Sequence, residues 1–169
     1  MTIQHANTND LPEILDLQKL AFHENAMRYN DFNIPPLTQT IDELTRESKS
    51  HVILKAVIDN KIIGSVRSCQ KDDYAYIGRL IVHPDYQNQG IGRRLMIAIE
   101  NEFDVPKYKL TTGHLDDKNI ELYSKLGYKI GEKEKISENL YFIHMEKANA
   151  AVRRYMPEDE GLLFGLLER

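Results

Sequence analysis

A chain of 169 residues is the size of one domain, because a single hydrophobic core typically serves about 100–200 residues. Apolar residues make up 41% and charged residues 28%, the balance of a folded globular protein rather than of a disordered chain. No apolar run reaches the length of about 20 residues that a membrane helix needs. The formal charge of −4 argues against a nucleic-acid partner, which usually requires a basic face, and fits a cationic substrate better.

The first residues and the cysteine content bear on the cellular compartment. The N-terminus has neither the positive charge nor the apolar core of a secretory signal. The one cysteine, Cys69, cannot form an internal disulfide and is interpreted as a small buried side chain on a strand. We therefore expect a cytoplasmic protein that does not associate with membranes.

Two capping signals mark helices in the first third of the chain. Asp10 followed by Glu13, and Thr40 followed by Glu43, have the spacing of a capping box, and apolar residues follow each pair. Between them, two consecutive prolines block helix continuation. These patterns predict a helix at residues 11–22, a loop at 31–36 and a helix at 41–48.

The rest of the chain alternates between extended and helical patterns. Segments dense in β-branched and apolar residues, separated by turn residues, are typical of strands. Other segments repeat apolar residues at helical intervals. The predicted strands are 51–58, 62–70, 74–82, 107–112, 128–134 and 140–145, and the predicted helices are 91–103 and 117–126. This order predicts one mixed α/β domain over residues 1–147, followed by an extension at 148–169 whose structure stays open.

A glycine-rich segment between a predicted strand and a predicted helix is the sharpest local signal. Glycine lets the backbone approach a ligand closely, and N–H groups at a helix N-terminus form a site for an anion such as a pyrophosphate. A glycine turn that only caps the helix would give the same pattern. The segment consists of Gln87, Asn88, Gln89, Gly90, Ile91, Gly92 and Arg93.

Two other phosphate-binding motifs do not fit this segment. A P-loop requires Lys followed by Ser or Thr, and neither stands at the required position. A dinucleotide-binding fingerprint fails because Leu95 occupies the place of its third glycine.

Two motifs in one order and spacing resemble the GNAT family of N-acetyltransferases. Residues 87–93, preceded by Leu-Ile-Val-His-Pro and followed by Arg-Leu-Met, resemble the acetyl-CoA motif of that family. Residues 119–128, Asn-Ile-Glu-Leu-Tyr-Ser-Lys-Leu-Gly-Tyr, resemble its second signature. The matching order of elements extends the resemblance over residues 2–147.

The resemblance implies where acetyl-CoA would bind. Family members have a central sheet, flanked by helices, that splays into a V between the strands predicted at 74–82 and 107–112, with the cofactor in the gap. The pyrophosphate would then contact the N–H groups of residues 87–93. The pantetheine arm would bond to the backbone of the central strand and to a side-chain amide, here Leu80, Ile81, Val82 and Asn119.

The resemblance also implies catalytic roles. Tyr123 would protonate the departing thiolate, because a phenol with an ordinary pKa of about 10 stays protonated at neutral pH. A backbone N–H of the central strand would meet the thioester oxygen, with Ile81 the first choice and Leu80 or Val82 as alternatives. The transfer would occur by direct attack of the amine within a ternary complex.

No motif identifies the general base. The resemblance places Tyr76 where histone-acetylating relatives carry glutamate, and a tyrosine of ordinary pKa is a poor base at pH 7. Asp73, Glu24 and His83, or a chain of waters, stay open as alternatives, although His83 is interpreted first as structural. The missing base also leaves open a non-catalytic acyl-CoA-binding or regulatory module.

The acceptor carries no motif either. We expect a primary amine of a small molecule or peptide, enclosed by residues 25–36 and 113–116. The remaining histidines lack metal-ligand spacing, so we expect no metal site. Family domains commonly pair, and the leucine-rich end of residues 148–169 offers an apolar surface, so we expect a homodimer.

Overall fold

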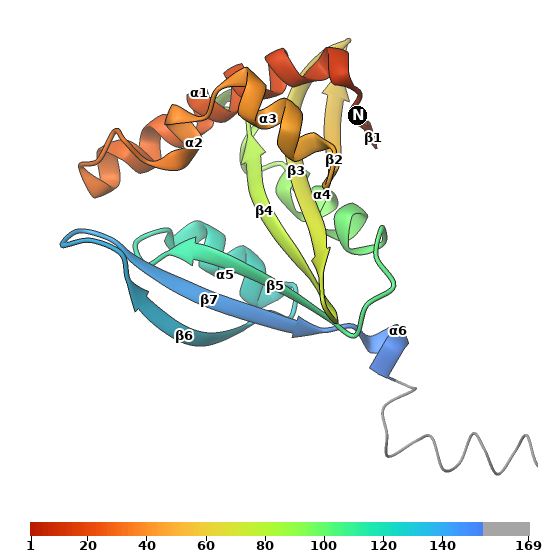
Figure 1. The fold of residues 1–169 in the computed structure, drawn as a ribbon, viewed down its shortest axis with the longest axis vertical. Helices are drawn as coiled ribbons and strands as arrows, with labels where there is room; N and C mark the ends of the chain where they lie inside the picture. Colours follow the sequence, from red (N-terminus) through yellow and green to blue (C-terminus); the bar gives the residue numbers. More distant parts are fainter. Residues whose placement is uncertain (154–169) are drawn as a thin grey trace, which may run out of the picture.

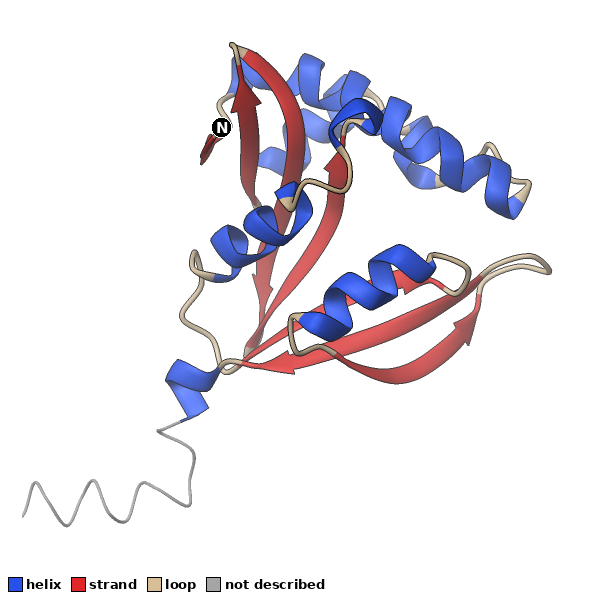
Figure 2. Ribbon diagram, turned by 180° about the vertical axis from the view of Figure 1, so that it is seen from behind, coloured by secondary structure: helices blue, strands red, loops and turns tan. Residues whose placement is uncertain are grey.

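A seven-stranded mixed sheet forms the centre of the protein in a computed structural model, which describes residues 1–153. Helices flank both faces of this sheet (Figures 1 and 2). The strand order is β1-β2-β3-β4-β5-β7-β6, and only β4 and β5 are parallel neighbours. The predicted mixed α/β fold is confirmed. Most of the extension predicted at 148–169 lies outside the described residues.

The bounds of the elements are as follows. The strands are β1 (Thr2–His5), β2 (Val52–Ile58), β3 (Lys61–Lys71), β4 (Tyr74–Val82), β5 (Lys107–Gly113), β6 (Lys129–Lys135) and β7 (Tyr141–Ala148). The helices are η1 (Thr8–Asp10), α1 (Leu11–Tyr29), α2 (Pro35–Thr38), α3 (Ile41–Ser48), η2 (Pro84–Tyr86), α4 (Ile91–Glu100), α5 (Asp117–Lys125) and α6 (Ala150–Arg153).

The sheet is split between β4 and β5. These strands pair only from Tyr74 opposite Lys107 to Ile77 opposite Leu110, and they diverge beyond that point. Figure 1 shows the resulting V, with β1 to β4 in one arm and β5 to β7 in the other. A bulge lies in β4 where the divergence begins, because Arg79 has a φ of 51°, a left-handed conformation uncommon outside glycine.

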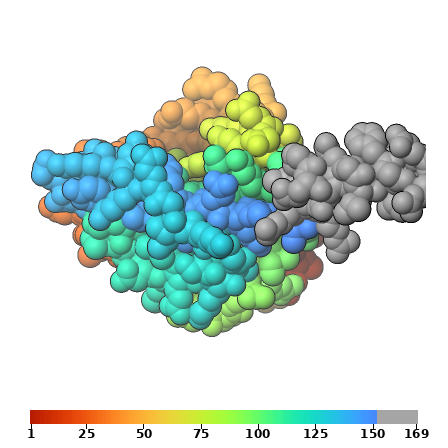
Figure 3. All heavy atoms as spheres, turned by 90° about the horizontal axis from the view of Figure 1, so that it is seen from below, coloured from red at the N-terminus to blue at the C-terminus, as the bar shows by residue number. Residues whose placement is uncertain are grey.

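Helices cover the two faces of the sheet unequally. On one face α4 buries Leu95, Met96 and Ile99 completely, in a core that continues behind β5 and β7. On the other face α1 and α3 bury Ile14 and Leu44 against β2 to β4. No described helix covers β5, β7 and β6 on this second face, so it is open there (Figure 1). Seen from below, the turn between β3 and β4, in yellow, lies beside the teal and blue second arm (Figure 3).

The first helix is longer than predicted. The prediction ended it at residue 22, because the next residues are polar, but α1 continues to Tyr29. Ala26 and Tyr29 extend its buried stripe, and Asn30 ends it with a φ of 51°. Its capping box was also assigned wrongly: Asn7 pairs with Asp10 as the box, one turn earlier.

The other departures have equally local causes. Strand β1 was not predicted, because four mostly exposed residues at a sheet edge carry no apolar alternation. Helix α2 lies in the predicted loop, where its prolines occupy the first turn, a position at which no N–H donor is required. Helix α4 ends at Glu100 rather than at residue 103. The second capping box, Thr40 with Glu43, is confirmed.

Candidate active site

The glycine-rich segment lies at the N-terminus of α4, at the opening of the V. Gly90 is the N-cap residue with a φ of 78°, and Asn88 also has a positive φ of 62°. No side chain caps this end of the helix. The loop is exposed from Gln87 to Gly90, whereas the Ile91 side chain is buried in the core. Ile91 therefore has only its backbone available for a ligand.

The register of β4 decides which backbone groups face the gap. The His83 N–H donates to the Ile63 carbonyl oxygen at 2.8 Å, and Ile81 pairs with Ser65. Because N–H groups alternate along a strand, the Ile81 N–H points toward β3 and the Val82 N–H toward the gap. The Leu80 carbonyl oxygen also faces the gap, since it lies opposite the Ile81 N–H across a trans peptide bond.

This register bears on the oxyanion donor. An N–H directed into the β3 ladder is not available to a thioester oxygen in the gap. The alternation therefore disfavours Ile81, the first choice from the sequence, and leaves Leu80 and Val82.

Helix α5 meets both of these elements. A Cβ added at Gly92 would lie 3.4 Å from the Leu122 side chain and 3.8 Å from that of Leu80. Asn119 and Tyr123 are one helical turn apart and so share a face of α5. Tyr123 is 7% exposed, and burial raises the pKa of its phenol. Its hydroxyl makes no hydrogen bond to another described residue.

The end of α1 bridges the two arms of the V. Arg28 and Asn25 both donate to the buried Asp116 carboxylate at the start of α5. The Tyr29 hydroxyl accepts a hydrogen bond from the Leu115 N–H at 2.9 Å. Burial raises the pKa of Asp116, while the Arg28 guanidinium opposes that shift. The two segments predicted to enclose the acceptor are thus in contact.

A chain of polar side chains crosses four strands on the open face of the sheet. The Tyr76 hydroxyl donates to Thr111 Oγ1 at 2.9 Å, and Thr111 Oγ1 lies 3.2 Å from His144 Nδ1. On the other side of the imidazole, Nε2 lies 3.0 Å from Glu134 Oε1. This hydrogen-bond chain therefore links β4, beside the gap, to the exposed carboxylate of Glu134 on β6. Sequence reasoning identified Tyr76 but missed its three partners, which are 10 to 35 residues apart along the chain.

The other residues considered as a base lie in less suitable places. His83 Nδ1 accepts from the Asp85 N–H at 3.1 Å, and its ring packs edge-on against Tyr86. Asp73 is 64% exposed beside Lys107, and Glu24 is 69% exposed and paired with Arg28.

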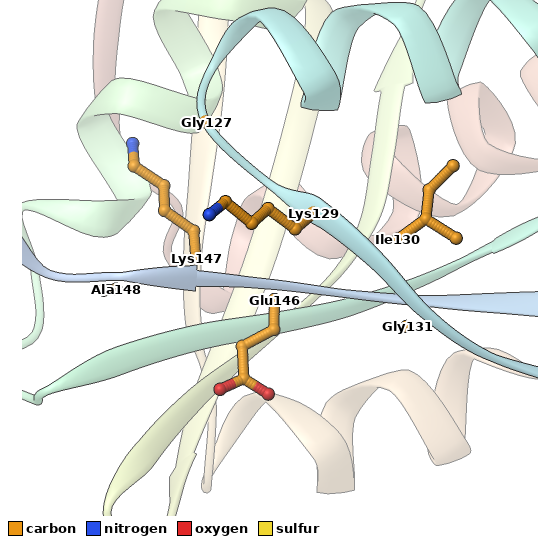
Figure 4. Close-up of a pocket in the computed structure, with 7 residues that line it drawn as sticks. All are labelled: Gly127, Lys129, Ile130, Gly131, Glu146, Lys147 and Ala148. Atoms are coloured by element: carbon orange, nitrogen blue, oxygen red, sulfur yellow. The ribbon is translucent and has the colours of Figure 1, made fainter.

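A shallow pocket occurs elsewhere, against β6 and β7 (Figure 4). In the close-up, Lys147 and Glu146 extend from opposite sides of β7. None of the residues of the glycine-rich segment or of Asn119 and Tyr123 lines this pocket. It is separate from the site described above.

Comparisons with known proteins agree with this geometry. The model of the acetyltransferase (GNAT) family matches residues 11–128. The chain therefore belongs to the GNAT family, as its motifs predicted. Within residues 1–153, every helix is too short or too polar to cross a lipid bilayer, and no cluster of three potential metal ligands occurs.

Individual relatives support the same fold. The UPF0157 protein YqkA of Bacillus subtilis is 28% identical over 140 residues, which are 82% of this chain and 40% of YqkA. The chain thus spans about two fifths of the length of this relative. The PaiA N-acetyltransferase of Thermoplasma acidophilum, solved with coenzyme A, has a TM-score of 0.70 at 17% identity, covering 88% of this chain and all of that one. The ribosomal-protein-S18-alanine N-acetyltransferase of Escherichia coli has a TM-score of 0.71 at 20% identity, covering 87% and 92%.

Proposed function

We propose that this protein transfers an acetyl group from acetyl-CoA to the primary amine of a small molecule or peptide. The observation that carries this proposal is the V between β4 and β5, with the uncapped N-terminus of α4 at its opening. An exposed strand edge suits the amides of a pantetheine arm, and the helix N-terminus suits a pyrophosphate. Membership of the GNAT family supports the same activity.

The donor would be held mainly by backbone groups. The Leu80 carbonyl and the Val82 N–H would bond to the pantetheine arm, with Asn119 beside them. The N–H groups of residues 87–93 would bind the pyrophosphate, helped by the exposed Arg93 guanidinium. Since the arm occupies the Val82 N–H, the Leu80 N–H would meet the oxygen of the thioester carbonyl.

The open-face chain supplies the base that the sequence does not show. Because the Tyr76 hydroxyl donates toward Thr111, its oxygen is free to accept a proton from the incoming ammonium. With the imidazole proton on Nε2, each hydrogen bond points outward, so a proton accepted at Tyr76 moves through Thr111 to His144 Nδ1. Glu134 then stabilises the imidazolium, as a carboxylate does in other histidine-based catalysts.

The chemical step then balances. The neutral amine attacks the thioester carbon, a C–N bond forms and the C–S bond breaks. His144 first releases its proton to solvent beside the exposed Glu134, so the same hydrogen-bond chain can accept the surplus proton that the nitrogen carries after attack. Tyr123, held protonated by burial, donates a proton to the thiolate and regains one from solvent, so each transfer releases one proton. The products are the acetylated amine and free coenzyme A.

The experiment measures thiol release from acetyl-CoA across a panel of small amines and peptides, alongside calorimetry of coenzyme A binding. We expect binding and turnover together. The variant Gly90→Val places a β-branched residue at a φ of 78° and should lose coenzyme A binding at least tenfold while remaining folded. Binding without turnover of any amine would favour the non-catalytic acyl-CoA-binding module. Equal binding by folded Gly90→Val would reject the loop assignment.

The predicted homodimer stays a prediction. Sedimentation velocity of the full chain would support it by a mass of two chains at micromolar concentration and contradict it by a mass of one.

A further inference from the structure

Three cations lie around Tyr76 without a carboxylate partner among the described residues. Lys71 Nζ is 5.0 Å from the centre of the Tyr76 ring, and Lys109 Nζ is 4.3 Å from that of Tyr74. The Arg79 guanidinium is 6.0 Å from the ring of Phe22 on α1. Each contacts an aromatic face, which stabilises a cation without neutralising it. We call Lys71, Arg79 and Lys109 the cationic patch.

Arg79 is the least expected of the three. It occupies the bulge of β4 with a φ of 51°, a backbone conformation that is costly for a residue with a side chain. Its guanidinium is half-buried, and burial lowers its pKa. The charge of Glu47 acts on it, but that carboxylate already accepts a hydrogen bond from Gln39 at 2.6 Å and lies 3.2 Å from Arg67 Nε.

Arg67 increases the excess of positive charge. This buried guanidinium donates through Nη2 to Gln18 at 2.6 Å. Its Nε lies near Glu47, but the N–H is not directed at the carboxylate and makes no hydrogen bond. Glu47 is therefore already ion-paired with Arg67, which leaves the half-buried Arg79 without a carboxylate of its own among the described residues. A desolvated cation without a partner is costly, and a bound anion would offset that cost.

The patch surrounds the position that the acceptor must occupy. Arg79 directly precedes Leu80, whose carbonyl oxygen faces the gap, and Tyr76 begins the chain proposed to accept the amine proton. Lys71 and Lys109 lie on the strands to either side of β4. An acceptor whose amine reaches the thioester from the open face therefore approaches Arg79, with Lys71 and Lys109 on the neighbouring strands.

We propose that the acceptor is an amine that carries a carboxylate close to its nitrogen, and that Arg79 binds this carboxylate. The proposal rests on the proposed acetyl transfer. Lys71 and Lys109 attract the same group at longer range. A guanidinium suits a carboxylate because it can donate two parallel hydrogen bonds. The local charge thus reverses the expectation of a cationic substrate that the net charge of −4 suggested.

The test compares acceptors that differ only in the carboxylate. One arm uses free amino acids and their carboxamides, and the other uses peptides with Asp or Glu at the second position and the same peptides with Asn or Gln. In one of the two arms we expect the carboxylate form to have a KM at least tenfold lower than the amide form. That arm shows whether the acceptor is a free amino acid or an acidic peptide. Arg79→Gln should remove this difference by raising the KM of the carboxylate form, and Arg79→Lys should restore part of it. Lys133→Gln, which removes a lysine stacked on Tyr141 outside the patch, is the matched control and should change nothing.

A binding measurement separates this proposal from the activity itself. Ligand-observed NMR on the protein with coenzyme A bound reports acceptor binding without turnover. Carboxylates that bind in an Arg79-dependent manner but are never acetylated would reject the activity and keep the anion site. Amides acetylated as well as carboxylates, or carboxylate binding equal in wild type and Arg79→Gln, would overturn the anion site.

Discussion

Buried charges are compensated on one face of the sheet and only partly compensated on the other. Behind the sheet, the Glu100 carboxylate on α4 accepts from Tyr128 Oη and from Lys147 Nζ, each at 2.8 Å. In front, Arg67 is ion-paired with Glu47, but its Nε–H makes no hydrogen bond, and Arg79 is ion-paired with no described carboxylate. The rear cluster is electrically balanced, and both carboxylate oxygens of Glu100 accept a hydrogen bond, whereas the front cluster has an excess positive charge.

This difference indicates different roles. The balanced cluster joins α4 to Tyr128, directly before β6, and to Lys147 on β7, and so holds the second arm of the V in place. A cluster with an excess charge weakens the free protein unless a ligand completes it. The rear cluster therefore belongs to the fold and the front cluster to the acceptor site. Variants on the two faces can test this division.

The largest effect on stability is expected at the rear cluster. Glu100→Ala leaves the Lys147 ammonium and the Tyr128 hydroxyl without their partner, and breaking such a buried pair typically costs about 3–5 kcal/mol. Urea denaturation should show this loss, while kcat at a temperature where the variant is folded stays near wild type. The double variant Glu100→Met with Lys147→Met should recover much of the stability. A Glu100→Ala protein as stable as wild type would remove the distinction between the two faces.

The next effect concerns the proton chain on the open face. His144→Ala removes the imidazole between Thr111 and Glu134, so kcat should fall about 10²–10⁴-fold, the usual range for general base catalysis. His5→Ala is the matched control, because His5 also pairs with a carboxylate, Glu102 at 2.9 Å, but lies on β1 at the opposite end of the strand order. The loss should appear in kcat, with little change in the affinity for coenzyme A. A folded variant that keeps the wild-type kcat would exclude the hydrogen-bond chain as the base.

The sequence predicts the fold better than it predicts this site. Apolar periodicity and turn residues depend on near neighbours, which is why strands such as 74–82 were placed at their observed bounds. The signal failed where tertiary contacts decide the structure. Helix α1 passes residue 22 because Arg28 and Tyr29 meet the β5–α5 loop, and that contact spans almost ninety residues of sequence.

The donor half of the site was predictable and the acceptor half was not. Backbone contacts to a cofactor require glycines and a helix start within a few residues, which forms a motif. Thr111, His144 and Glu134 come together only because β5, β7 and β6 are adjacent in the sheet. The excess charge at Arg79 is equally invisible, since it depends on Glu47 being already engaged.

A matched pair of tyrosines sharpens the comparison. The Tyr128 hydroxyl donates a hydrogen bond to Glu100, whereas the Tyr123 hydroxyl makes no hydrogen bond to a described residue. The two rings are neighbours, with their centres 6.0 Å apart. Tyr123→Phe keeps the ring, so kcat should fall at least about tenfold with little change in coenzyme A affinity or stability. Tyr128→Phe should lower stability and leave kcat near wild type. Wild-type kcat for Tyr123→Phe, at a pH where chemistry limits the rate, would make Tyr123 a packing residue.

The smallest effect is expected where a front-face charge is already paired. Arg28→Met removes the cation beside the buried Asp116, and because Arg28 is one-third exposed the expected loss is only about 1 kcal/mol at pH 8. The sign follows from the pKa of Asp116, which burial raises and Arg28 lowers. A raised pKa gives a contribution to stability that is present at low pH and lost as pH rises through the folded value. Without Arg28 the folded pKa of Asp116 is higher still, so the variant should lose more stability than wild type between pH 4 and pH 8 and differ little at pH 4.

Urea midpoints across this pH range measure the difference in stability between Arg28→Met and wild type, with Arg46→Met, on the exposed side of α3, as the control. A penalty that is constant with pH would show that Arg28 acts through packing, and that the pairing with Asp116 contributes nothing to the bridge between the arms.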